Sequence, residues 1–192
     1  ANEVSASSII ALAFIGIFFG WGYTAPPIKF SYRGLGEIVN SLMHGPAVVL
    51  AGFVLQTGIW TNTLPWLLGL PLFFATLAAA ILGALPDYRA DGEISRKTIP
   101  VVVGPRWSAI LALCFITLAT IAGASLWYFK LIPGPLSIGI VLVVPNALIQ
   151  ERAVLKMIKT ADYDRHMTDI MKYADLQMLL FGLIPLLSFL WR

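Results

Sequence analysis

Two aspartates and a basic pair lie close together near the middle of the chain. Asp87 and Asp91 are four residues apart, and Arg96 and Lys97 follow them, all within the stretch Leu85 to Gly104. If the segment is helical, this spacing puts both carboxylates on one face, where they can hold Mg²⁺. The adjacent cations can then bind a diphosphate that carries the metal. Because long apolar segments flank the stretch on both sides, the sequence predicts chemistry on a lipid diphosphate at a membrane surface.

A solvated loop, in which the aspartates simply pair with arginines, is the alternative interpretation of the same stretch. Arg89 and Arg96 are both available for such pairs. Two acids four residues apart are weak evidence for a metal site when they stand alone. Their position between two apolar runs, followed by Arg-Lys-Thr, favours the diphosphate site.

A second polar segment lies nearer the N-terminus. Tyr23, Lys29 and Arg33 precede Glu37, so hydrogen-bond donors and one carboxylate gather after the first apolar run. They can be further contacts to a bound substrate. They can equally be an interfacial anchor, with the tyrosine and lysine at headgroup level and Arg33 paired to Glu37.

The elements that must position these residues are membrane-spanning helices. The 192 residues are 58% hydrophobic and only 12% charged, with a mean hydropathy of +0.83, which excludes an ordinary soluble domain. Apolar runs of this length must be helical, because backbone groups in lipid have to bond within their own segment. We therefore predict an all-α, polytopic membrane protein, a single transmembrane domain over residues 1–192. The six predicted spans are Ser8–Tyr23, Ile38–Gln56, Leu64–Leu85, Trp107–Phe129, Leu131–Ile149 and Leu176–Trp191.

The loops divide sharply by charge. The first, third and fifth loops carry two, four and five basic residues, together eleven of the thirteen in the chain, whereas the second and fourth hold only Lys130. The positive-inside rule places the three basic loops, which carry the motifs, in the cytoplasm and both termini on the opposite side. The modest net charge of +3 needs no nucleic acid to explain it.

Two further features have competing interpretations. Apolar residues at helical spacing in residues 151–175 predict two helices projecting past the membrane, with a break at 160–162; a solvated hairpin is favoured over a surface for partner subunits. His44 falls inside the second span, where a polar residue is a functional candidate, although a hydrogen bond between helices is the commoner role.

Taken together, the motifs resemble the UbiA superfamily of membrane prenyltransferases. The resemblance rests on Tyr-x-x-Pro-Pro-x-Lys from Tyr23, Tyr-Arg-Gly-Leu-Gly-Glu from Tyr32, Leu-Pro-Asp-Tyr-x-x-Asp from Leu85 and Arg-Lys-Thr-x-x-Val from Arg96. Within the superfamily, the chain is most similar to the menaquinone-type branch, which prenylates 1,4-dihydroxy-2-naphthoate.

The resemblance implies a role for each of the candidate residues. Asp87 and Asp91 would ligate Mg²⁺ and act in catalysis, while Arg96 and Lys97 would contact the diphosphate of a polyprenyl donor. Further contacts to the diphosphate or the aromatic acceptor would come from Lys29 and Arg33, and Tyr23 would line the pocket. The expected setting is an integral membrane protein of a bacterial inner membrane, surrounded by lipids.

The resemblance covers the last six helices of the family. The family's first three helices have no counterpart in the sequence, and neither has the first Asp motif, which belongs to them. Because one carboxylate pair holds at most one Mg²⁺, we expect this chain alone to be inactive. It could be part of a longer enzyme or half of a split one. It could also be a non-catalytic subunit of a larger membrane assembly, such as a respiratory or photosynthetic complex, or a module that binds quinone or lipid.

Overall fold

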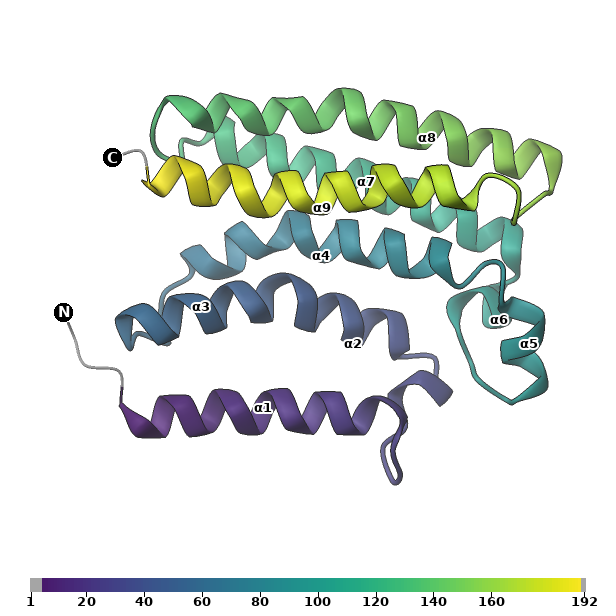
Figure 1. Ribbon diagram of the computed structural model, residues 1–192, viewed down its shortest axis with the longest axis horizontal. Coiled ribbons are helices and arrows are strands. Elements are labelled where there is room, and N and C mark those ends of the chain that lie inside the picture. The colour runs from purple at the N-terminus through teal and green to yellow at the C-terminus, as the bar shows by residue number, and fades with distance from the viewer. Residues whose placement is uncertain (1–4, 191–192) are drawn as a thin grey trace.

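The computed structural model describes residues 5–190, which fold as a layered array of long helices (Figure 1). The long segments are α1 (Ala6–Thr24), α2 (Gly36–Leu42) continued by the π-turn η2 (Met43–Ala47) and α3 (Val48–Thr57), α4 (Leu64–Gly83), α7 (Pro105–Tyr128), the 3₁₀ segment η3 (Pro135–Leu142) continued by α8 (Val143–Thr160), and α9 (Met167–Leu190). Three short elements lie between them: η1 (Phe30–Tyr32), α5 (Tyr88–Glu93) and α6 (Ile99–Val103). The described residues contain no strand.

Six of these segments are long and apolar enough to cross a bilayer. The prediction of an all-α, polytopic membrane protein is therefore confirmed. The first four predicted spans match the helices to within two residues at each end. The fifth helix begins later than predicted, at Pro135, and runs on to Thr160. Trp191, the predicted end of the sixth span, lies outside the described residues.

Residues 151–175 form the helical hairpin that their periodicity predicts. α8 ends at Thr160, Ala161 adopts a left-handed conformation with φ 52°, and α9 begins at Met167. The buried stripe of α8 includes Val154 and Met157, which pack into the same core as Ile170 of α9. The charged half of this hairpin is thus continuous with the two apolar spans rather than a separate element.

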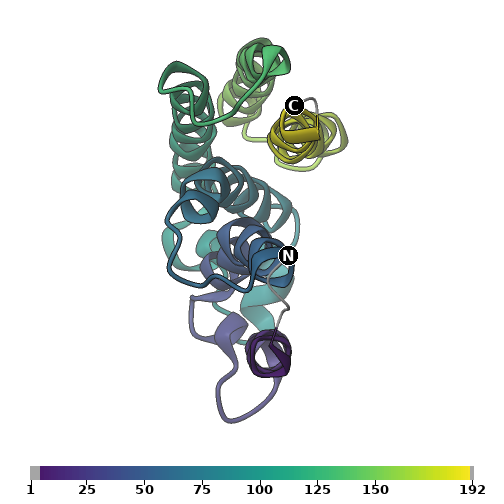
Figure 2. The same cartoon turned by 90° about the vertical axis from the view of Figure 1, so that its left-hand side faces the viewer.

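α4 is the central helix of the array. It packs against α7 on one side, α2 and η2 on another, and α9 on a third. Half of its apolar window is buried within the chain, compared with 11% for α1. The difference follows from composition, because the alanines Ala75, Ala78 and Ala79 let neighbouring helices approach closely. Viewed along the helices, α1 lies at the edge of the array, opposite α8 (Figure 2).

A kink in the second span brings it against α4. Pro46 lacks an N–H and interrupts the helical hydrogen bonds, and Gly45 leaves the helical region at φ −101°, ψ −106°. A Cβ added to Gly45 would lie 2.7 Å from the backbone nitrogen of Phe73, and one added to Gly69 would collide with Pro46. The absence of side chains at both glycines therefore allows the two backbones to touch.

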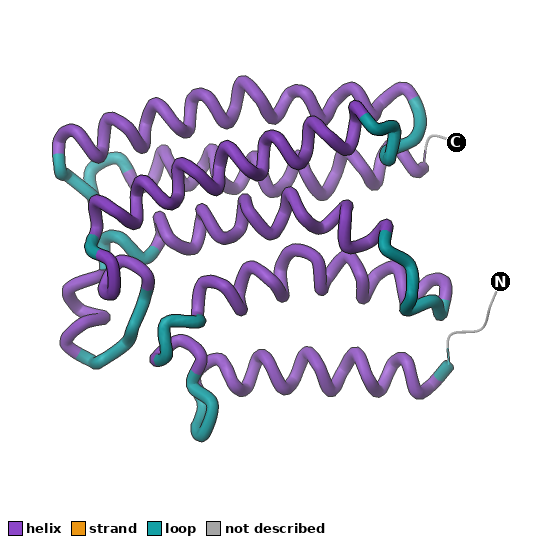
Figure 3. The backbone as a smooth tube through the Cα atoms, turned by 180° about the vertical axis from the view of Figure 1, so that it is seen from behind, coloured by secondary structure: helices purple, strands orange, loops and turns teal. Residues whose placement is uncertain are grey.

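The backbone trace shows that the loops alternate between the two ends of the helices, as predicted (Figure 3). The loop containing η1, the α5–α6 segment and the α8–α9 turn lie at one end of the helices, and the α3–α4 and α7–η3 connections lie at the other. We call the first of these the motif end. All the candidate site residues belong to this end.

Candidate active site

The two motif aspartates lie one helical turn apart but in different surroundings. Asp87 occupies the position before α5, and its carbonyl oxygen accepts a hydrogen bond of 2.8 Å from the Asp91 backbone N–H. Asp87 is exposed to solvent, whereas Asp91 is buried, with 6% of its surface accessible. The helical spacing expected from the sequence is present, with one carboxylate free to meet a ligand and the other held in the protein.

Asp91 is held by Arg96. The guanidinium nitrogen lies 3.3 Å from the Asp91 carboxylate, and the Arg96 backbone N–H donates to the Asp91 carbonyl at 2.9 Å. Burial lowers the pKa of Arg96, but the charge of Asp91 and the hydroxyl of Tyr23 more than offset this, and the pKa lies above its ordinary value. The pairing proposed in the alternative interpretation is therefore present for this aspartate, between Asp91 and Arg96.

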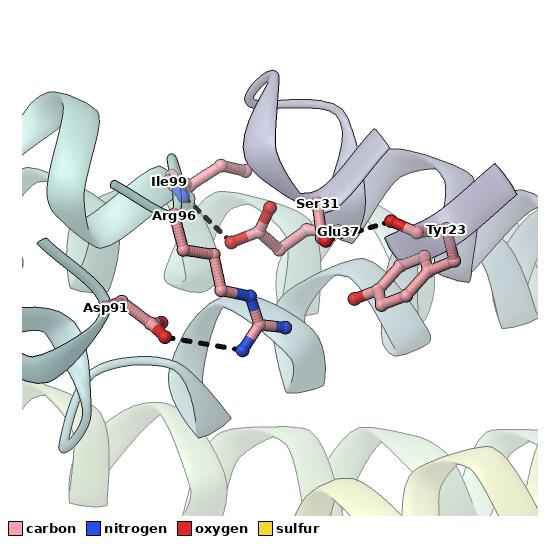
Figure 4. Close-up of polar contacts among 6 residues, drawn as sticks. All are labelled: Tyr23, Ser31, Glu37, Asp91, Arg96 and Ile99. Carbon is pink, nitrogen blue, oxygen red and sulfur yellow. Dashed lines mark hydrogen bonds and ion pairs between the residues drawn. The ribbon is translucent and has the colours of Figure 1, made fainter. Parts of the chain in front are cut away.

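Tyr23 reaches the same place from the end of α1 (Figure 4). Its hydroxyl passes close to Gly36, since a Cβ added there would lie 3.4 Å from it. The Ser31 hydroxyl donates to the Tyr23 carbonyl at 2.9 Å, which fixes the turn that follows α1. These contacts hold the turn of the first loop, and the Tyr23 side chain lies beside Arg96 of the third loop (Figure 4).

Glu37 joins these two loops directly. One oxygen of its carboxylate accepts a hydrogen bond of 2.8 Å from the backbone N–H of Ile99, 62 residues further along the chain. The side chain is buried, with 5% of the residue accessible. Arg33 donates instead to the Pro27 carbonyl at 2.8 Å, so the suggested Arg33–Glu37 pair is wrong. The sequence offered one sign of this buried role, because Glu37 is a carboxylate at the start of an apolar span.

The remaining basic residues of the predicted site are exposed. Lys29, Arg33 and Lys97 all face solvent, and none of them takes part in an ion pair within residues 5–190. The Lys29 ammonium lies 5.4 Å from the centre of the Tyr32 ring. These three cations remain available to an anion from outside the protein.

The carboxylates do not form an all-protein metal cage. Within residues 5–190 there is no group of three His, Cys, Asp or Glu side chains that could hold a metal ion. Mg²⁺ commonly uses one or two carboxylates, with substrate phosphates and water completing its shell. Exposed Asp87 suits that mode of binding, whereas a metal at Asp91 would have to share the carboxylate with Arg96.

A pocket of about 450 Å³ also opens at the motif end, between the α4–α5 corner and the α8–α9 turn. Its lining includes Pro86, Tyr88 and Arg89 on one side and Asp162 and Tyr163 on the other. The Arg89 guanidinium donates to the Tyr88 hydroxyl at 3.1 Å, and within residues 5–190 it is not paired with an aspartate. Neither Asp87 nor Asp91 lines this pocket, so it is adjacent to the candidate site rather than part of it.

His44 does not contribute to the candidate site. Its Nδ1 lies 2.9 Å from the carbonyl oxygen of Asn40, one turn earlier in the same span. The predicted hydrogen bond between helices is therefore wrong, because the bond that His44 makes lies within its own span.

Comparisons with known proteins agree with the motifs. The UbiA prenyltransferase family matches residues 6–174. The 1,4-dihydroxy-2-naphthoate octaprenyltransferase of Bacillus subtilis is 27% identical over 132 residues, which is 67% of this chain and 40% of that protein. The UbiA prenyltransferase domain-containing protein 1 of Dictyostelium discoideum is 30% identical over 97 residues, which is 50% of this chain and 29% of that protein.

A third relative is the 2-carboxy-1,4-naphthoquinone phytyltransferase of Synechocystis, 29% identical over 75 residues, 39% of this chain and 23% of that protein. The matched stretches thus span less than half the length of each of these relatives. No solved structure gives a significant match. Because the family match extends over most of the chain, from the first helix into the last, the chain belongs to the UbiA prenyltransferase family.

Proposed function

We propose that the chain takes part in transferring a prenyl group from a prenyl diphosphate to an aromatic acceptor of the naphthoquinol type, in quinone biosynthesis. The observation that carries the proposal is the meeting of the two motif loops at one end of the membrane helices. Asp87 and Asp91 lie one turn apart there, with Arg96 and Tyr23 beside them. The names of the Bacillus and Synechocystis relatives support a naphthoquinone-type acceptor.

Each group in the proposed site has a role in ionising the donor. Asp87 and Asp91 would hold Mg²⁺, which when bound neutralises charge on the diphosphate. Arg96 and Lys97, with Lys29 and Arg33, donate hydrogen bonds to the diphosphate oxygens as the allylic C–O bond breaks and both bonding electrons pass to the leaving oxygen. A ring carbon of the acceptor then attacks the allylic carbon and loses its proton.

We further propose that the motif end faces the cytoplasm. It carries eleven of the thirteen basic residues, and the positive-inside rule favours that side for basic loops. The opposite ends of α1 and α9 then lie across the membrane. The diphosphate headgroup of the prenyl donor would reach the site from the cytoplasm, while the prenyl tail of the donor stays among the apolar helices.

The described residues supply one carboxylate pair, which we propose is half of the metal site. Neutralising a leaving diphosphate depends on metal and cations together, and one pair holds one Mg²⁺ at best. We propose that further carboxylates come from the same or another polypeptide and that the 192 residues alone turn over poorly.

The test is an assay in lipid nanodiscs with Mg²⁺, a prenyl diphosphate and 1,4-dihydroxy-2-naphthoate, with prenylated product detected by mass spectrometry. Intact-mass analysis of the purified sample identifies any longer form or companion chain. Product formed by a sample that contains the longer form or companion chain, and lost in Asp87→Asn, supports the proposal. Product formation unaffected by Asp87→Asn and Asp91→Asn together would refute the assigned carboxylates.

One observation favours a second candidate, a non-catalytic subunit of a larger membrane assembly or a quinone-binding module. Asp91 is already paired with Arg96, so this one carboxylate is satisfied electrostatically without a metal. This candidate predicts quinone or partner binding that is unchanged by EDTA, and unrelated membrane proteins in the purified complex.

A further inference from the structure

Glu37 is a buried charged residue that the proposed reaction does not use. It lies in the first turn of α2, and one carboxylate oxygen accepts the Ile99 N–H at 2.8 Å (Figure 4). The other carboxylate oxygen is buried and has no hydrogen-bond partner within the described part of the chain. A buried carboxylate is costly, so its presence here indicates that the contact with Ile99 matters.

The contact caps α6. This helix has only five residues, Ile99–Val103, and is too short to be stable alone. Thr98 occupies the N-cap position, but its hydroxyl makes no capping bond and is buried without a partner in residues 5–190. The carboxylate of Glu37 therefore supplies from another helix the acceptor that the first turn of α6 needs.

This cap fixes the path of the basic pair. Arg96 and Lys97 lie between two anchors: the Arg96 N–H is bonded to the Asp91 carbonyl, and Ile99 is bonded to Glu37. A Cβ added to Gly34 would lie 3.7 Å from the Lys97 carbonyl oxygen, so the first loop also packs against this segment. Releasing the second anchor would free residues 96–98 at one end.

We propose that Glu37 is a positioning residue, whose carboxylate holds the Arg96–Lys97 segment in place to bind a diphosphate. The inference rests on the proposed function for the identity of the anion. Glu37 acts through Ile99, because its carboxylate oxygen accepts a hydrogen bond and not because the side chain is charged. A glutamine, whose side-chain oxygen also accepts a hydrogen bond, should therefore preserve this role.

The test compares Glu37→Leu with Glu37→Gln, and uses Glu93→Gln, an exposed carboxylate on α5, as the control. Hydrogen–deuterium exchange of the peptide covering residues 96–104 reports the cap, and titration with Mg²⁺ and inorganic pyrophosphate reports the anion site. In Glu37→Leu, we expect exchange to rise and pyrophosphate affinity to fall, each about five- to tenfold, as for one lost capping bond. Glu37→Gln and Glu93→Gln should stay within about twofold of the unsubstituted chain.

The outcomes separate this inference from the proposed function. Unchanged exchange in Glu37→Leu, or a loss in Glu37→Gln as large as in Glu37→Leu, overturns the capping role. Raised exchange with unchanged pyrophosphate affinity shows that the cap does not position the basic pair, and also overturns the inference. If the unsubstituted chain binds no pyrophosphate, the proposed function fails, while the exchange of the two variants still decides whether Glu37 holds the segment.

Discussion

At the scale of single residues, the two motif aspartates differ in what surrounds them. Asp91 is buried and bonded to Arg96, whereas Asp87 is exposed at the start of α5. The two aspartates that the spacing predicts as a metal pair therefore differ: Asp91 is bonded to Arg96, and Asp87 is exposed. Substitutions at the two positions should separate stability from ligand binding.

We expect Asp91→Asn to lower the free energy of unfolding by about 1–3 kcal/mol, because it leaves the half-buried Arg96 without its counter-charge. Asp87→Asn should leave stability unchanged within about 0.5 kcal/mol. Thermal unfolding in detergent measures both. Equal destabilisation by the two substitutions would contradict the asymmetry between the aspartates.

Ligand binding provides the complementary prediction for the same pair. If both carboxylates hold Mg²⁺, Asp87→Asn should abolish the Mg²⁺-dependent part of pyrophosphate binding without loss of fold. Titrations with and without EDTA measure that part, and Glu93→Gln is the matched control on the same helix. Full retention of Mg²⁺-dependent binding in Asp87→Asn would exclude Asp87 as a ligand.

At the scale of elements, the kinked second span packs closely against α4. The glycines on the two sides, Gly45 and Gly69, face Phe73 and Pro46 with no room for a methyl group. This packing connects α2, which carries Glu37, to the central helix, so it stabilises the scaffold of the candidate site.

Gly69→Ala should therefore destabilise the protein by about 1–3 kcal/mol through overpacking against Pro46. Gly52→Ala in α3 is the control, because a Cβ there meets nothing within 4 Å and alanine is the better helix former. Thermal unfolding of the two variants compares the positions. A Gly69→Ala variant as stable as Gly52→Ala would show that the two helices can move apart at no cost.

At the scale of the whole molecule, the arrangement of the loops makes the orientation testable. Glu93 lies at the motif end, and Thr61 lies in the α3–α4 connection at the opposite end; both are exposed. Cys114, an exposed residue of α7, is first replaced by alanine to remove the native thiol.

In intact cells, a membrane-impermeant maleimide should label Thr61→Cys but should label Glu93→Cys only after permeabilisation, because the positive-inside rule places the motif end in the cytoplasm. Reversed labelling would overturn the cytoplasmic orientation. Labelling of both cysteines from the same side would contradict the six-span topology.

The sequence by itself determined the membrane helices, their number and the grouping of the motif loops at one end. Lipid offers no hydrogen bonds to the backbone, so long apolar runs have one stable form, and each crossing reverses the side on which the next loop lies. The break in the hairpin near residue 161 was also accessible, because it depends on neighbours in the chain. The late start of the fifth helix was missed because the apolar run was followed through residues 131–134, although Pro133 and Gly134 are residues typical of a turn.

Only the tertiary structure decided which groups meet. Arg96 rather than Arg89 pairs with Asp91, Arg33 turns to a carbonyl of its own loop, and Glu37 reaches Ile99 across 62 residues. The first two contacts span only five and six residues, but the Glu37–Ile99 contact depends on how the second span packs against α4, through glycine contacts that hydropathy cannot register. The physical reason is range: bonding within a span is local and uniform, whereas the choice of a polar partner depends on how whole helices pack together.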